Sequence, residues 1–120
     1  MGKVSWIYHK GIKIVHLDLA NALPRDFYPV LEEGAKVIRY QVPNSVFTLT
    51  DVINARYNRD ISQKMKEFTR ENKPYVKAAA VLGITGLKKI IFSAILKFSK
   101  RTIQVCNNIE EAKEWLVEQK

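Results

Sequence analysis

Short apolar segments and longer amphipathic segments alternate along this chain. The short segments are rich in β-branched, leucine and aromatic residues, and they predict strands at residues 4–8, 12–17, 46–52, 76–82 and 102–106. The longer segments repeat apolar residues at helical spacing, and they predict helices at residues 26–40, 60–71 and 85–98, with a last helix after Asn108. This order of elements predicts an α/β fold.

The spacing between the predicted strands indicates how they pair. Only His9-Lys10-Gly11 separates the first two strands, which is too short for a crossover and predicts an antiparallel hairpin. A segment of helical length separates each later pair, and such connections favour right-handed crossovers between parallel strands. We therefore predict a five-stranded mixed sheet in which the first strand is antiparallel and the rest are parallel.

Several predicted strands alternate between apolar and polar residues. Phe47 and Leu49 alternate with Thr48 and Thr50, and the second and fifth strands alternate in the same way. A parallel strand covered by helices on both faces would instead be apolar at every position. We therefore expect the four helices to lie mostly on one face of the sheet, with the other face partly open.

The composition is that of one globular domain. The chain has 120 residues, of which 47% are hydrophobic, and it has no internal repeat or Ser/Gly-rich linker, so we predict a single domain over residues 1–120. No apolar run approaches the ~20 residues that span a bilayer, and residues 1–8 lack the pattern of a signal peptide. A single cysteine, Cys106, excludes an internal disulfide framework. These features predict a cytoplasmic protein.

The formal net charge is +8, from 20 Lys and Arg residues against 12 Asp and Glu residues. Such a balance favours anionic partners, which include acidic protein surfaces, anionic lipids and nucleic acids. The alternative is that the charge only keeps the domain soluble. Nucleic-acid binding is the less favoured partner class, because the chain lacks interleaved aromatic and basic residues and any recognisable helix-turn-helix.

Local motifs accompany this order of elements. They are Thr50-Asp51-Val52, Ala55-Arg56-Tyr57, Asn72-Lys73-Pro74-Tyr75-Val76-Lys77, Gly83-Ile84-Thr85-Gly86-Leu87-Lys88-Lys89 and Glu110-Glu111-Ala112-Lys113-Glu114-Trp115-Leu116. Together with the element order they resemble the STAS, or SpoIIAA-like, family of anti-sigma factor antagonists, and within it a bacterial branch of mostly unassigned function. The resemblance spans nearly the whole chain and implies the SpoIIAA-like fold. Activity does not follow from it, because one fold serves many functions.

Anti-sigma factor antagonists of this family carry a phosphorylatable Ser or Thr at the start of the second helix. Asn58, Arg59 and Asp60 occupy those positions here, and none of them accepts a phosphoryl group from a serine kinase. Ser62 lies further inside the predicted helix, where it is a poor kinase substrate. The resemblance therefore implies a binding module without the usual phosphorylation switch, with Asn58 as a candidate contact residue.

Candidate binding residues follow the predicted parallel strands. Asp18, Asp51 and Thr85 come at or after the carboxyl ends of the second, third and fourth strands, and open α/β sheets bind ligands at that edge. Arg56 and Tyr57 near the same edge are further candidates. In the alternative interpretation these residues are structural: the two aspartates cap turns, and Arg56 pairs with a nearby aspartate to hold the loop.

A magnesium-dependent receiver domain also carries aspartates at this edge. Here Asp18 is the only acidic residue that ends the second strand, and no lysine follows the fifth strand. His9 and His16 have no acidic or cysteine companions at metal-ligand spacing, and no Ser-His-Asp or Cys-His set can be assembled. We therefore predict no metal, no cofactor and no enzymatic activity, with hydrolase or kinase-like chemistry as the least favoured function.

The predicted helix at residues 85–98 offers two further features. Its start combines glycines with Thr85 and Lys88, which indicates either an anion site at exposed N–H groups or a turn with Thr85 as the N-cap. Phe92 and Leu96 lie opposite the main apolar stripe, among lysines. Such a pair is typical of a partner surface, a dimer contact or a membrane-skimming helix. The alternative is a helix that is buried on all sides.

Two functions fit these features best. The first is a non-catalytic binding or regulatory module that recognises a protein partner or a second copy of itself. Its contact surface would be residues 51–60 or the helix face with Phe92 and Leu96. The alternative is the binding of a small molecule, a lipid or an anion at the carboxyl edge of the sheet, with peripheral membrane contact as one form of it.

Overall fold

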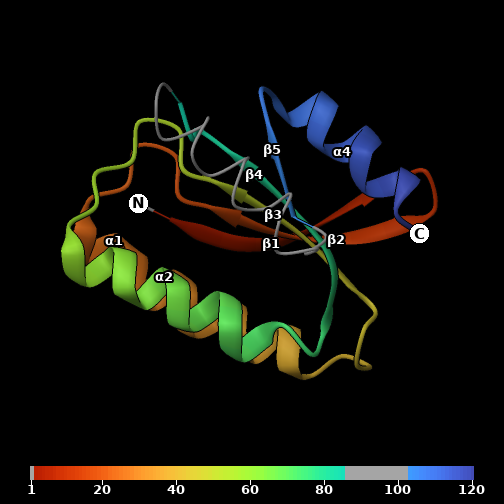
Figure 1. Ribbon diagram of the computed structural model, residues 1–120, viewed down its shortest axis with the longest axis horizontal. Helices are drawn as coiled ribbons and strands as arrows, with labels where there is room; N and C mark the ends of the chain where they lie inside the picture. Colours follow the sequence, from red (N-terminus) through yellow and green to blue (C-terminus); the bar gives the residue numbers. More distant parts are fainter. Residues whose placement is uncertain (1, 86–102) are drawn as a thin grey trace.

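The computed structural model of this chain describes residues 2–85 and 103–120. Strands and helices follow one another in the order that the sequence predicts (Figure 1). The described elements are β1 (Lys3–His9), β2 (Ile12–Asp18), α1 (Pro24–Arg39), β3 (Val46–Asp51), α2 (Arg59–Asn72), β4 (Val76–Leu82), β5 (Ile103–Cys106) and α4 (Ile109–Glu118).

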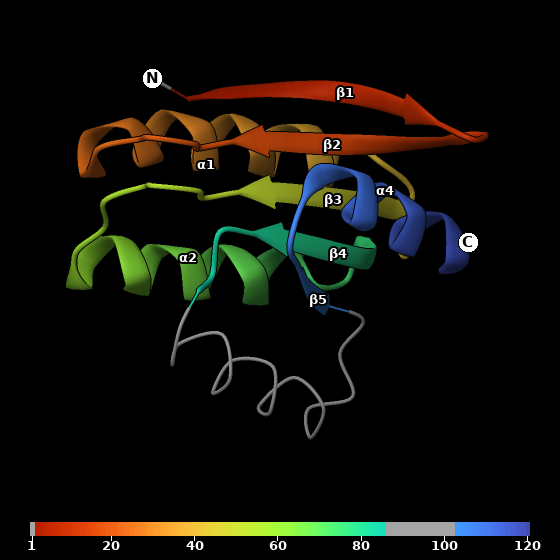
Figure 2. The same ribbon diagram turned by 90° about the horizontal axis from the view of Figure 1, so that it is seen from above.

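The sheet has five strands in the order β1-β2-β3-β4-β5 (Figure 2). β1 and β2 are antiparallel, whereas β2, β3, β4 and β5 run parallel, so the predicted mixed sheet is confirmed. The hairpin turns at Lys10 and Gly11, which both have positive φ angles of 45° and 86°. Two such residues form the tight turn whose twist matches the strands on either side.

Side chains cap two of the helices. Asn58 accepts a hydrogen bond from the N–H of Ile61 at the start of α2, at 2.9 Å. In the sequence, Asp60 with Gln63 three residues on predicts a cap at Asp60, and this is wrong because the helix begins at Arg59, so that Asp60 already lies in its first turn. The sequence also predicts a capping pair of Asn108 and Glu111, and this is confirmed at α4: Asn108 accepts from the N–H of Glu111, at 2.8 Å.

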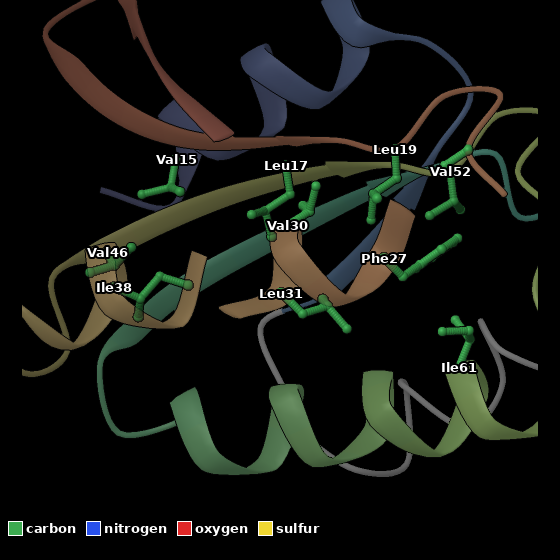
Figure 3. Packing of buried hydrophobic residues seen from close by; sticks show 11 residues of the cluster. Val15, Leu17, Leu19, Phe27, Val30, Leu31, Ile38, Val46, Val52 and Ile61 are labelled. Carbon is green, nitrogen blue, oxygen red and sulfur yellow. The ribbon is translucent and has the colours of Figure 1, made fainter. Parts of the chain in front are cut away.

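Among the described residues, two helices cover one face of the sheet and one covers the other. α1 and α2 lie side by side on one face, and α4 lies on the opposite face (Figure 1). Each face has its own buried apolar cluster. Figure 3 shows the cluster beneath α1 and α2, formed mainly by Val15, Leu17, Leu19, Phe27, Val30, Leu31, Ile38, Val46, Val52 and Ile61. The cluster beneath α4 comprises Ile12, Ile14, Phe47, Leu49, Ala78, Ala80, Leu82, Cys106, Ala112 and Leu116.

Two of the three described helices share one face, as expected, but the expectation that the other face is partly open needs correction. Val15 and Leu17 alternate with polar residues in β2, and Phe47 and Leu49 do so in β3, but these two alternating sets point in opposite directions. Val15 and Leu17 of β2 face α1, whereas Phe47 and Leu49 of β3 face α4. Because each face receives apolar side chains, each face requires a cover.

The expected helix at residues 85–98 lies outside the described residues, except for Thr85. The predicted roles of Lys88, Phe92 and Leu96 lie outside them as well. Of the four expected helices, the described part of the chain contains three. None of these three has the length and the apolar character that crossing a membrane requires.

Candidate functional site

Loops that follow β2, β3 and β4 emerge together at the carboxyl edge of the sheet, at the left of Figure 2. Backbone hydrogen bonds continue between residues 19–22 and residues 51–56 at the ends of the strands and beyond them. They run from Leu19 N–H to Asp51 C=O, from Asn21 N–H to Ile53 C=O and from Arg56 N–H to Ala22 C=O, each at 2.8 Å. These two loops are therefore held in one arrangement by their own backbones.

The third loop packs against the second through Gly83. This residue has a φ of 97°, and a Cβ atom built on it would lie 2.5 Å from the backbone nitrogen of Ile53. Only glycine combines this backbone conformation with such a close approach. Thr85 is exposed in the same loop, and an N-cap role for it would require residues beyond the described range.

Exposed apolar side chains collect on these loops and on the first turn of α1. Among the described residues, seven large hydrophobic side chains are exposed, and four of them lie here: Leu23 (36%), Tyr28 (44%), Ile53 (39%) and Tyr57 (37%). We call these four residues the loop platform. The ring of Tyr57 meets the buried ring of Phe27 edge to face, with 6.3 Å between centroids, which anchors the platform to the core.

Three arginines border the loop platform. Arg25, Arg56 and Arg59 are exposed, and none of them forms an ion pair with a residue that the structure describes. The suggested pairing of Arg56 with Asp51 or Asp60 is therefore absent, and Arg56 holds its loop through its backbone N–H instead. Asp60 accepts a hydrogen bond from the hydroxyl of Tyr28, and this bond raises the pKa of that hydroxyl.

The start of α2 is built as a structural cap. The side chain of Asn58 is engaged by Ile61, and its carbonyl oxygen accepts from the N–H of Ser62 at 2.9 Å. Ser62 is partly buried within the helix. Asn58 is thus placed beside the loop platform, but its side-chain oxygen already serves the helix.

Asp18 and Asp51 end two neighbouring strands and lie side by side in the register of β2 and β3. The Oδ1 atom of Asp18 accepts from the N–H of Ala20 at 3.1 Å, and that of Asp51 accepts from the N–H of Ile53 at 3.0 Å. Both aspartates therefore cap the turns that follow them, in agreement with the structural alternative. This use engages one oxygen of each carboxylate.

His16 lies next to these two aspartates, and this proximity was not predicted from the sequence. One ligand atom from each of His16, Asp18 and Asp51 lies within 4.8 Å of the others. The expectation that His16 has no acidic companions is therefore wrong. Asp18 is two residues further along the same strand, which places both side chains on one face. Asp51 comes from the neighbouring strand, and only the strand register brings it there.

The environment of His16 affects its chemistry. Its pKa is lowered, mainly because partial burial disfavours the charged imidazolium, while Asp18 and Asp51 oppose that shift. The Nε2 atom is inaccessible to solvent and has no hydrogen-bond partner within the described part of the chain. A buried nitrogen without a partner is uncommon and calls for an explanation.

Two open hollows among the described residues lie away from this edge. The larger, about 580 Å³, is an open hollow along α1 between Glu32 and Tyr40. The other, about 290 Å³, lies between the hairpin and Phe47. The alternative prediction of a small molecule, lipid or anion at the carboxyl edge therefore gains no support from an enclosed pocket there.

Sequence reasoning found Asp18, Asp51, Arg56, Tyr57 and Asn58, and the structure places all of them at one edge. It missed the remaining platform residues, Leu23, Tyr28 and Ile53. A usable signal was present: Leu23 and Ile53 are apolar residues in turns beside Asn21 and Asn54, which both adopt positive φ. Asparagine tolerates positive φ and favours turns, so Asn21 and Asn54 indicate the loops in which Leu23 and Ile53 lie.

Comparison with known proteins bears on the fold. No protein-family model matches the sequence, and no curated protein matches it. Among solved structures, the chain is similar to an uncharacterized protein of the DUF3478 family from Shewanella loihica PV-4, which has a SpoIIAA-like fold. The TM-score is 0.70 at 13% sequence identity, and the match covers 96% of this chain and 93% of that one. The fold of this chain is SpoIIAA-like.

Proposed function

Starting from a SpoIIAA-like fold, we propose that this chain is a non-catalytic module that binds an acidic protein partner. The partner covers the loop platform, and its carboxylates meet the arginines at the border. The observation that carries this proposal is the exposure of four apolar side chains on backbone-paired loops, beside three arginines without an ion-pair partner among the described residues.

The apolar part of the platform supports a protein as the partner. Ile53 and Tyr57 expose apolar surface that binding would remove from water, which is favourable. Tyrosine and arginine are enriched among the residues that dominate the energy of protein interfaces. The loops are already held by hydrogen bonds, so little conformational entropy is lost when a partner binds.

The charge of the border supports an acidic partner. An exposed guanidinium, such as that of Arg56, which forms no ion pair with a described residue, offers two parallel hydrogen bonds to a carboxylate. Asp60 is the one acidic residue between Asp51 and Glu67, so the three arginines outnumber the carboxylates at the border. The net charge of +8 adds long-range attraction for an acidic surface.

The start of α2 supports binding without a phosphorylation switch. Asn58 stands at the cap position and uses its side chain for Ile61, and Ser62 is partly buried one turn inside. Binding would then be controlled by the concentration of the partners or by another ligand rather than by a kinase.

Quantitative affinity capture from cells that express the chain tests the proposal. We compare the wild type with Ile53→Ser and Arg56→Glu, which change the platform and its border. Tyr40→Ser and Lys36→Glu are matched controls, because Tyr40 is 91% exposed and both residues lie at the far end of α1. We expect the same partner to be lost about tenfold or more from the platform variants alone, and its capture to fall with added salt.

Two results would contradict this function. One is a set of captured proteins that is identical for the platform variants and the controls. The other is a partner whose binding surface is basic, since Arg56→Glu should then strengthen binding. Circular dichroism of each variant checks that the fold is intact, and light scattering shows whether the partner is a second copy of the chain.

A further inference from the structure

We propose that His16, Asp18 and Asp51 form a binding site for a divalent transition-metal ion on the α4 face of the carboxyl edge. One imidazole nitrogen and two carboxylate oxygens would bind the ion, and water would fill the remaining positions. This site requires neither the loop platform nor a protein partner, so the two proposals stand or fall separately.

The three ligand groups are already assembled. Their ligand atoms all lie within 4.8 Å of one another, and no hydrogen bond or ion pair joins any of the three side chains to another. Ligands of one ion at about 2.1 Å lie roughly 3 to 4 Å apart, so small side-chain rotations complete the set. All three residues lie on adjacent strands, which position ligands more precisely than loops do.

Atoms that could bind an ion are without hydrogen-bond partners among the described residues. Asp18 and Asp51 each use Oδ1 for a backbone N–H, and the second oxygen of each accepts no hydrogen bond from a described residue. The Nε2 atom of His16 is inaccessible to solvent and likewise has no partner within the described range. Buried polar atoms are normally paired, and a bound cation is one of the accepted explanations for an exception.

Charge also favours a cation here. Two carboxylates in register on paired strands repel each other, and an ion between them removes that repulsion. Lys3 and Lys113 add positive charge near His16, but neither forms an ion pair with Asp18 or Asp51. The carboxylates are thus not neutralised by a direct contact, although the two lysines will moderate the affinity.

The donor set selects the class of ion. Carboxylates alone suit Mg²⁺ and Ca²⁺, whereas imidazole suits Zn²⁺, Fe²⁺ and similar ions. A set of one imidazole and two carboxylates therefore favours a first-row transition ion over Mg²⁺ or Ca²⁺. Zn²⁺ and Mn²⁺ are suitable probes, the first for affinity and the second for its paramagnetism.

Isothermal titration of the full, untagged chain with Zn²⁺ tests the proposal. We expect one ion per chain with a Kd below about 100 µM, and a loss of about tenfold or more in Asp51→Asn and in His16→Gln. Asn keeps the oxygen that holds the N–H of Ile53, so the turn is preserved. Asp60→Asn and His9→Gln are matched controls that lie outside the three ligands and should bind as the wild type does.

Nitrogen NMR of the wild type provides a second measurement that does not depend on a variant. Zn²⁺ should shift the ring nitrogens of His16 and leave those of His9 unchanged, and Mn²⁺ should broaden signals from Asp18 and Asp51. The proposal is overturned by the absence of binding up to about 1 mM Zn²⁺, by unchanged affinity in Asp51→Asn, or by shifts confined to His9. If His16→Gln fails to fold, Asp51→Asn and the NMR measurement still decide.

Discussion

At the scale of single residues, Gly83 decides how closely the loop after β4 approaches the loop after β3. Its φ of 97° suits glycine, and the backbone of Val52 and Ile53 occupies the space that a side chain would need. Neither constraint can relax alone, because the neighbours are backbone atoms rather than flexible side chains. The close packing of the two loops at the carboxyl edge therefore depends on the absence of a side chain at Gly83.

We predict that Gly83→Ala lowers the free energy of unfolding by more than about 1 kcal/mol. Gly11→Ala is the matched control, because its φ of 86° imposes similar strain while the nearest atom to its Cβ would be the Lys120 Nζ at 3.8 Å. Urea denaturation measures both. The excess loss in Gly83→Ala is the effect of crowding against Ile53, and equal losses would show that the close packing contributes nothing.

The positions of Asp18 and Asp51 could be predicted from the sequence, whereas the role of His16 could not, and the difference has a physical reason. Asp18 and Asp51 could be predicted because each follows an apolar strand directly, so local order alone places them at the edge. The role of His16 could not be predicted, because its distance to Asp51 depends on the register between β2 and β3. Register is determined by packing across the sheet, and no local spacing encodes it.

At the scale of elements, α2 begins where a single side chain supplies the missing hydrogen bond. The first N–H groups of a helix have no partner within it, and Asn58 satisfies that of Ile61. Ile61 is fully buried in the cluster beneath α1 and α2, so the cap also fixes a core residue. The first turn of α2 therefore joins the cap at Asn58 to the buried side chain of Ile61 and to the exposed side chain of Tyr57 beside it.

We predict that Asn58→Ala lowers the free energy of unfolding by about 1 kcal/mol, the usual cost of losing a side-chain cap. Asn58→Asp should retain the stability, because a carboxylate oxygen accepts the same hydrogen bond and is favoured at a helix amino terminus. Thermal or urea unfolding of the two variants gives the comparison. A loss in Asn58→Asp as large as that in Asn58→Ala would show that the amide group itself is needed.

The arrangement of the helices was the less predictable part at this scale. The alternation in β2 and β3 predicts which residues within each strand share a face. It does not predict whether the apolar residues of both strands lie on the same face of the sheet. Val15 pairs with Thr48 and Leu17 pairs with Thr50, so Val15 and Leu17 lie on the opposite face from Phe47 and Leu49. The alternation of one strand shows which of its residues share a face, but which face that is becomes clear only from the register with the neighbouring strand.

At the scale of the whole molecule, the sheet separates two apolar clusters. The cluster beneath α1 and α2 draws on two helices, whereas α4 is the only described helix over the other face. Leu116 of α4 is fully buried there, together with Leu49 at the centre of the sheet. The second face therefore depends on a short helix far along the chain.

We predict that Leu116→Ala lowers the free energy of unfolding by about 2–5 kcal/mol, the range for buried leucines. Val42→Ala is the control: Val42 is 71% exposed, and its truncation should cost less than about 0.5 kcal/mol. Urea denaturation measures both. A loss below about 1 kcal/mol in Leu116→Ala would show that the face beneath α4 tolerates water, as an open face would.

The position of α4 after all five strands affects how the chain is made. A ribosome releases residues in order, so α1 and α2 can close their side of the sheet while the other side still lacks its cover. Phe47 and Leu49 then lack α4, their cover among the described helices, until it has left the exit tunnel. Nascent chains that stall before Ile109 should therefore be targets for chaperones and prone to aggregation.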